Sequence, residues 1–250
     1  MASTALKDAA RRDLVLRNVA TLADAPRVDN RKHQEGFWTA DELNLFLSEA
    51  RGNTWEVCFR LLALTGMRRG EVLGLRWEDV DLDAGLLHIR KQLVFDHSNE
   101  AGGGSKLAAP KTKRSRRTIS IGPDVVAMLR DHQATQLASH LDSGVGNVLG
   151  LVVTGPNGYN ANASSVAAEF KKLVSELDVR PITLHGLRHT HATLLLSADR
   201  YPLEVSERLG HQSVAFTLDH YGHVIPNDAA AVAQAGEAAV DAHNRWTPQP

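Results

Sequence analysis

The residues best suited to chemistry are arginines, histidines and one tyrosine, gathered in three short segments. The chain has only three tyrosines, and one of them, Tyr221, lies in a histidine-rich stretch. A guanidinium binds phosphate oxygens through paired N–H groups and keeps its charge throughout a reaction. A phenol has an ordinary pKa of about 10 and becomes nucleophilic where nearby cations favour the phenolate. Such residues are suited to phosphoryl transfer. The segments are TGMRRGE (65–71), LHGLRHTHATLL (184–195) and LGHQSVAFTLDHY (209–221).

Each segment also has a purely structural interpretation. Arg68 and Glu71 lie three residues apart and can pair on the surface of a helix, where Glu71 would steady the arginine. Tyr221 can be an ordinary helix residue that seals a small core. We interpret His189 as a structural residue, a buried partner of backbone groups. Cys58 lies in the apolar run VCFRLLAL, which favours a packed core position over a nucleophile.

A cluster of positive charge interrupts a nearly neutral chain. The formal net charge is −1, yet the run from Lys106 to Arg117 holds six basic residues and no acidic one. A run of this kind is either a solvated loop or a local surface for phosphate groups. The total charge therefore does not exclude a nucleic acid as partner.

A metal site is a second chemical possibility for the histidine-rich region. His185 and His189 are four residues apart, a spacing that suits zinc on one face of a helix. However, the chain contains no HExxH motif, and the neighbouring arginines would repel a cation. We therefore predict no metal and no other cofactor.

Four segments in this order resemble the signature segments of the tyrosine recombinase (phage integrase) family: TGMRRGE, PKTKRSRRTI, LHGLRHTHATLL and LGHQSVAFTLDHY. The resemblance covers roughly residues 37–224, and the last two segments are highly specific. At one position the chain departs from the pattern, because Gly186 stands where many members carry an acidic residue.

The resemblance implies a role for each matching residue. Tyr221 would be the nucleophile, and a lysine on a β-hairpin would protonate the leaving 5′ oxygen. Lys111 matches that lysine, although Lys113 lies only two residues away. The implied catalytic set is Arg68, Lys111, His185, Arg188, His211 and Tyr221, with Glu71 in support and with Lys113, Arg114 and Arg116 on DNA.

The elements that must position these residues are mostly helices. Hydrophobic periodicity and capping signals predict a mainly α fold with one small antiparallel β-sheet (α+β). The resemblance implies the catalytic-domain fold of tyrosine recombinases. Expected helices span 5–23, 37–50, 54–66, 68–76, 124–138, 163–177, 187–198, 203–210, 213–221 and 228–242. Expected strands span 86–95, 117–121 and 149–153.

Two parts of different origin are expected along the chain. Residues 1–32 resemble the last helix of an N-terminal core-binding domain plus a linker, and residues 33–250 resemble the catalytic domain. The Ala-rich helix 228–242 would dock on a neighbouring protomer. The resemblance implies a homotetramer on two DNA duplexes, formed by a protein that is monomeric without DNA.

Composition limits the alternatives. The hydrophobic share of 43% and charged share of 23% are those of an ordinary globular protein, and no apolar run is long enough for a membrane span. A single cysteine and the lack of a secretion signal fit a reducing cytoplasm. The family resemblance implies that the protein is bacterial or phage-encoded.

The resemblance therefore implies a site-specific recombinase that cuts and rejoins double-stranded DNA through a 3′-phosphotyrosyl bond, without metal or ATP. Two alternatives remain open at this point. One is a non-catalytic DNA-binding relative, and the other is a DNA-relaxing enzyme of the type IB topoisomerase kind.

Overall fold

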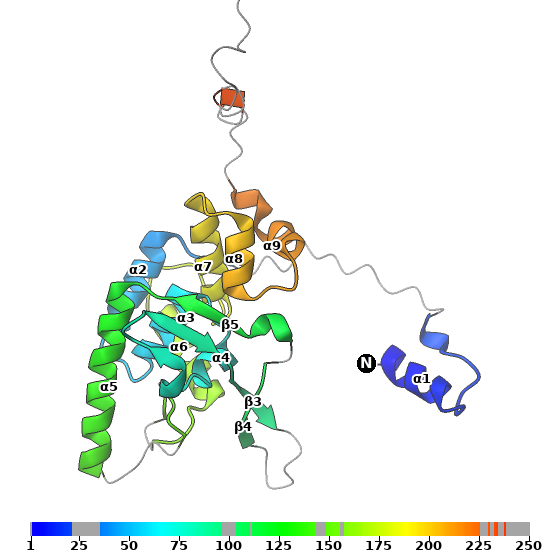
Figure 1. Ribbon diagram of the computed structural model, residues 1–250, viewed down its shortest axis with the longest axis horizontal. Helices are drawn as coiled ribbons and strands as arrows, with labels where there is room; N and C mark the ends of the chain where they lie inside the picture. The colour runs from blue at the N-terminus through cyan, green and yellow to red at the C-terminus, as the bar shows by residue number, and fades with distance from the viewer. Residues whose placement is uncertain are drawn as a thin grey trace, which may run out of the picture. The chain divides into compact units, whose positions relative to one another are not determined.

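The computed structural model describes residues 2–21, 36–96, 104–110, 112–143, 149–155 and 158–225, together with positions 230, 233, 234 and 238. The chain divides into two compact units, Met1–Gln34 and Glu35–Pro250, and all the described candidate site residues belong to the second (Figure 1). Lys111 and most of the helix expected at 228–242 lie outside the described residues.

In the first unit, helix α1 is shorter than the sequence predicts. It spans Ala2–Arg11, and a short 3-10 helix follows at Val19–Thr21, in place of one helix over 5–23. Asp13 adopts a φ of +54°, in the left-handed region that does not continue a right-handed helix. The assignment of residues 1–32 to a core-binding domain stays a prediction.

The helices expected between residues 37 and 221 are present, with small shifts at their ends. The capping box at the start of α2 is confirmed, because the Thr39 side chain accepts from the backbone N–H of Glu42 and the Glu42 carboxylate accepts from the N–H of Thr39. The helices are α2 (Ala40–Glu49), α3 (Glu56–Thr65), α4 (Arg69–Leu73), α5 (Pro123–Ser143), α6 (Ala163–Ser175), α7 (Gly186–Ser197), α8 (Pro202–Leu209) and α9 (Val214–Tyr221).

The antiparallel β-structure forms two small sheets instead of one. Strands β1 (Val80–Asp81), β2 (Leu86–Ile89) and β5 (Arg117–Ser120) form the first sheet in the order β1-β2-β5. Strands β3 (Gln92–Asp96) and β4 (Gly104–Ala108) form the second.

Two strand predictions were wrong. The stretch 86–95 is broken into β2 and β3, because β3 leaves the first sheet and packs against α4. Gly74 permits this approach, since a Cβ there would lie 2.6 Å from the backbone nitrogen of Leu93. The stretch 149–153 makes only an isolated bridge, between Arg76 and Leu151, yet Leu151, Val152 and Val153 are buried. Their apolar character reflects burial beside the core and not strand pairing.

A cluster of aromatic rings forms the centre of the main core. Phe46, Phe59 and Phe170 pack edge to face at 5.1–5.8 Å, and Trp38 packs against Phe46 and Phe170. Cys58 is fully buried in the same core, as predicted, and burial raises the pKa of its thiol to about 12. The thiol is therefore inert at neutral pH.

Helices α7, α8 and α9 lie side by side over a second, smaller core (Figure 1). Its buried members are Ala192, Leu196, Val205, Leu209 and Tyr221. The backbone N–H of Trp38 donates to the Thr190 hydroxyl at 3.0 Å, which ties the start of α2 to α7. The fold thus brings the three polar segments of the sequence to one place. None of the described helices combines the length and apolarity needed to cross a lipid bilayer.

Candidate active site

Arg188 is held in the interior by two backbone carbonyl groups. Its side chain on α7 donates from Nη1 to the Gly66 oxygen at 2.6 Å and from Nη2 to the Leu209 oxygen at 2.8 Å. Gly66 ends α3 at a φ of +67°, and a Cβ there would lie 2.5 Å from the Leu209 side chain. Burial, with the charge of Arg68, lowers the pKa of Arg188 to about 9, so the guanidinium stays charged at neutral pH.

Glu71 is the centre of a buried ion network. The surface pair considered for Arg68 and Glu71 is wrong, because the Glu71 side chain is only 1% exposed. Arg68 Nη1 and Arg117 Nη1 donate to one carboxylate oxygen at 2.9 and 3.1 Å, and Arg117 Nη2 and the Arg68 backbone N–H donate to the other at 2.9 Å. Burial alone would raise the pKa of Glu71, but the bonds and charges of Arg117 and Arg68 hold it below 4.5.

Arg117 is a site residue that the sequence analysis did not single out. Its Nε donates to the Arg208 oxygen at 2.6 Å, in addition to the two bonds with Glu71. It therefore joins β5, α4 and the end of α8. Its signal in the sequence was weak, because it is the last of six basic residues in a run that could be either a solvated loop or a surface for phosphate groups.

We expect Glu71→Gln to lower the free energy of unfolding by about 3 kcal/mol. The neutral side chain leaves Arg117, whose side chain is 7% exposed, without its countercharge and turns an amide NH2 toward arginine donors. Urea unfolding at pH 7 measures the difference. Glu78→Gln is the matched control, because Glu78 pairs with Arg76 at an exposed position, and we expect it to cost less than 1 kcal/mol. Equal losses in the two variants would contradict a buried network.

His211 is a buried, neutral imidazole in the connection between α8 and α9. Its Nδ1 lies 2.8 Å from the hydroxyl of Thr217, a fully buried residue of α9 that fixes the orientation of the ring. Burial, followed by the positive charges of Arg188 and Arg68, lowers the pKa of His211 to about 3. At neutral pH the ring is uncharged and can still donate one hydrogen bond.

Tyr221 lies at the end of α9 and is 4% exposed. Its ring is parallel to that of His211, with centroids 6.5 Å apart. Its hydroxyl lies 2.5 Å from Nδ1 of His189 on α7. The negative charge that Tyr221 would carry as phenolate is attracted to Arg188 and raises the pKa of that arginine. Tyr221, Arg188 and His211, three residues of the predicted catalytic set, therefore lie together within one chain.

The structure adds a contact for His189 that the sequence did not predict. This residue is half-buried, and its Nδ1 atom contacts the Tyr221 hydroxyl. Its ring also packs edge to face on exposed His185, with centroids 4.9 Å apart. The sequence signal for a contact between His185 and His189 was their four-residue spacing, because this spacing places both side chains on one face of a helix.

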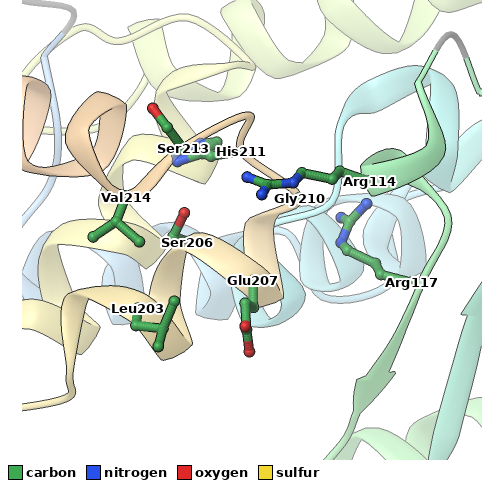
Figure 2. A pocket seen from close by; sticks show the side chains of 9 residues that line it. All are labelled: Arg114, Arg117, Leu203, Ser206, Glu207, Gly210, His211, Ser213 and Val214. Atoms are coloured by element: carbon green, nitrogen blue, oxygen red, sulfur yellow. The ribbon is translucent and has the colours of Figure 1, made fainter.

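The basic loop lies beside the site. Arg114 and Arg116 are exposed; the Arg114 guanidinium donates to the Gln212 oxygen, next to His211. Figure 2 shows Arg114 and Arg117 beside the α8–α9 connection, at a cavity of about 450 Å³. Lys113 lies in a 3-10 helix, Lys113–Ser115, and Lys111 is outside the described residues. Residues that line the cavity are Arg114, Arg117, Leu203, Ser206, Glu207, Gly210, His211, Ser213 and Val214.

The arrangement concentrates positive charge and hydrogen-bond donors around a phenol. Arg68 donates from Nη1 to Glu71 and from Nη2 to the Gly210 oxygen at 3.2 Å, and Arg188 donates to the Gly66 and Leu209 oxygens. A guanidinium has five N–H donors, so each arginine keeps further donors for an anion. Within the described ranges, no group of three His, Cys, Asp or Glu side chains is placed to hold a metal ion. A phosphate group fits this chemistry.

Comparisons of the sequence and of the fold with known proteins both find tyrosine recombinases and integrases. The profile of the phage integrase family matches residues 37–227. A XerC-like tyrosine recombinase of Caldanaerobacter subterraneus subsp. tengcongensis is 31% identical over 194 residues, 74% of this chain and 50% of the relative. The ICEBs1 integrase of Bacillus subtilis is 28% identical over 193 residues, 76% of this chain and 51% of the relative. The chain thus spans about half the length of these curated relatives.

Solved structures share the fold at low sequence identity. The Tn1549 transposon integrase, in complex with a circular intermediate DNA, has a TM-score of 0.70 at 20% identity, covering 95% of this chain and 76% of that one. A lambda integrase dimer bound to a core site has a TM-score of 0.57 at 17% identity, covering 88% and 56%. The predicted catalytic-domain fold is confirmed. Because the family profile covers more than half of the chain and all four signature segments, the chain belongs to the phage integrase family of tyrosine recombinases.

Proposed function

We propose that this chain is the DNA-cleaving part of a site-specific recombinase that cuts and rejoins DNA strands through a 3′-phosphotyrosyl intermediate, without metal or ATP. One observation carries the proposal: the Tyr221 phenol lies in the same cluster as Arg188, His211 and His189. Its neighbours in the solved structures include integrases in complex with DNA, which supports DNA as the substrate.

Arg68 and Arg188 would bind the non-bridging oxygens of the scissile phosphate. Both guanidiniums are preoriented, since Arg68 donates to the Gly210 oxygen and Arg188 to the Leu209 oxygen. Fixed donors of this kind stabilise the charge that develops on phosphoryl oxygens in the transition state. His211 would add a neutral donor, and His185 would complete the set from the start of α7. Glu71 would act as a positioning residue through Arg68.

Tyr221 would attack phosphorus in cis, because it lies beside the arginines and histidines of its own chain. The attack forms a bond from the phenolic oxygen to phosphorus and releases the 5′ oxygen of the DNA. The phosphotyrosine is again a phosphodiester, so a 5′ hydroxyl can reverse the step without ATP.

The leaving 5′ oxygen needs a proton, and a lysine of the basic loop would supply it. Lys111 is the first candidate by family resemblance and Lys113 the second. Three basic residues of the same loop would contact the phosphates of the DNA backbone: Lys113, Arg114 and Arg116. The bond from Arg114 to Gln212 supports this placement, because it ties the loop to the connection that carries His211.

The protein would be a monomer in the absence of DNA and would assemble into a homotetramer on DNA. We propose the segment 228–242 as the contact between protomers and residues 1–32 as the end of a core-binding domain with its linker. These assignments rest on family resemblance.

A covalent-capture assay tests the proposed function. The protein is incubated at low salt with a nicked suicide duplex that carries its attachment site, in EDTA and without nucleotide. We expect a protein–DNA adduct that survives denaturing electrophoresis. Absence of an adduct on DNA that the protein binds would favour the non-catalytic relative. Relaxation of a supercoiled plasmid without exchange between two marked duplexes would favour the topoisomerase-like enzyme.

A further inference from the structure

We propose that His189 is a catalytic residue that accepts the proton of the Tyr221 hydroxyl as the phenol attacks phosphorus. The inference rests on the proposed function and adds the general base of its first step. The sequence analysis gave His189 no part in the reaction, so the assignment depends on the tertiary contact with Tyr221.

The contact between the two side chains is direct. The Tyr221 oxygen and the His189 Nδ1 atom are 2.5 Å apart, and their ring centroids are 5.6 Å apart at an angle of 43°. A general base must lie within hydrogen-bond distance of the proton it takes, and this pair satisfies that condition before DNA binds. Both residues are anchored by their helices, Tyr221 in the small core and His189 on α7.

The other histidines beside the phenol use Nδ1 for different partners. His211 places its Nδ1 against the Thr217 hydroxyl, and its ring lies parallel to the phenol ring at 6.5 Å. His220 is exposed, and its Nδ1 bonds the Phe216 oxygen in its own helix. His189 is therefore better placed than either to receive the phenolic proton.

Groups from three parts of the chain surround His189. The titratable and charged groups placed around it are Tyr221 from α9, His185 from the start of α7, Arg188 next in sequence, and His211 from the α8–α9 connection. With its proton on Nε2, a neutral imidazole offers the Nδ1 lone pair to the hydroxyl.

Cleavage exchanges one phosphodiester bond for another and moves two protons. The bond between the Tyr221 oxygen and phosphorus forms while the bond from phosphorus to the 5′ oxygen breaks. The phenolic proton moves to Nδ1 of His189, and the lysine of the basic loop protonates the 5′ oxygen. In the religation step the imidazolium returns its proton to the departing phenol, which restores the starting state.

Single-turnover adduct formation with His189→Gln tests the proposal. Glutamine keeps a polar side chain but cannot take up a proton at neutral pH. We expect adduct formation at pH 7.5 to slow by about 100-fold or more. The wild-type rate should level off above the pKa of an imidazole. The variant's rate should instead keep rising with pH toward the ordinary phenol pKa of about 10.

Two controls separate this role from others. His220→Gln removes the neighbouring exposed histidine, and we expect a rate and a pH profile equal to wild type. A substrate with sulfur at the bridging 5′ position needs no general acid, so it should restore cleavage by a variant that lacks the acid lysine but not by His189→Gln. DNA binding and melting temperature, measured for each variant, show that the fold is kept.

The outcomes are distinct. Wild-type rate and pH profile in His189→Gln would overturn the assignment, as would rescue of this variant by the sulfur substrate. Faster cleavage by His189→Gln would also overturn it and would mean that His189 restrains the nucleophile. Absence of an adduct with the wild-type protein itself, on DNA that it binds, would instead count against the proposed function.

Discussion

A Tyr221→Phe variant is expected to bind DNA like the wild-type protein and to form no covalent adduct with it. The substitution removes a single oxygen atom, the only atom of this side chain that can attack phosphorus. The ring that lies parallel to His211 and packs in the small core is kept. We therefore expect complete loss of adduct on a suicide duplex and a stability change of about 1 kcal/mol, for the lost bond to His189.

The two other tyrosines of the chain provide matched controls. Tyr159 and Tyr201 are 56% and 74% exposed, and their replacement by phenylalanine also removes one phenolic oxygen. We expect adduct yields equal to wild type in both variants. An adduct that persists in Tyr221→Phe and disappears in either control would show that a different tyrosine is the nucleophile.

Arg188→Lys is expected to slow adduct formation by about 100- to 1000-fold, although the positive charge is kept. A lysine cannot reproduce the planar group that bonds the Gly66 and Leu209 oxygens while offering further donors to a phosphate. Loss of one preorganised donor to a developing charge typically costs a factor of this size. The affinity for DNA should change only a few-fold, because many other phosphate contacts contribute to the binding free energy.

Arg69→Lys is the matched control for this prediction. Arg69 lies in the same signature segment as Arg68 and is exposed. We expect its conservative replacement to leave the single-turnover rate within about two-fold of wild type. Similar slowing in both variants would mean that any arginine in this region affects cleavage through DNA binding alone.

Much of the local structure follows from short stretches of sequence. The capping box of α2 formed because Thr39 and Glu42 are three residues apart, and Gly66 ends α3 in the left-handed conformation that glycine adopts most readily. Such features depend on residues within one or two turns. The long helices were predictable for the same reason.

The errors arose where tertiary contacts outweigh local preference. The stretch 86–95 has the composition of one strand, but Gly70 in α4 and Gly74 directly after it leave room for β3 to depart from β2. The stretch 149–153 is apolar because it is buried, and composition does not distinguish burial in a loop from burial in a strand. The helix expected over 5–23 ends at Arg11, two residues before Asp13 with its positive φ.

The sequence by itself determined the family, the order of its main helices and the residue types around the candidate site. Only the tertiary structure decided which polar atoms meet. Glu71 receives Arg117 from 46 residues further on, and the Tyr221 hydroxyl meets His189 across 32 residues. Helical spacing places side chains on a face, but the partner that this face meets depends on how helices pack and where strands turn. The buried carboxylate network and the histidine beside the phenol therefore became visible only once α4, β5, α7 and α9 were placed together.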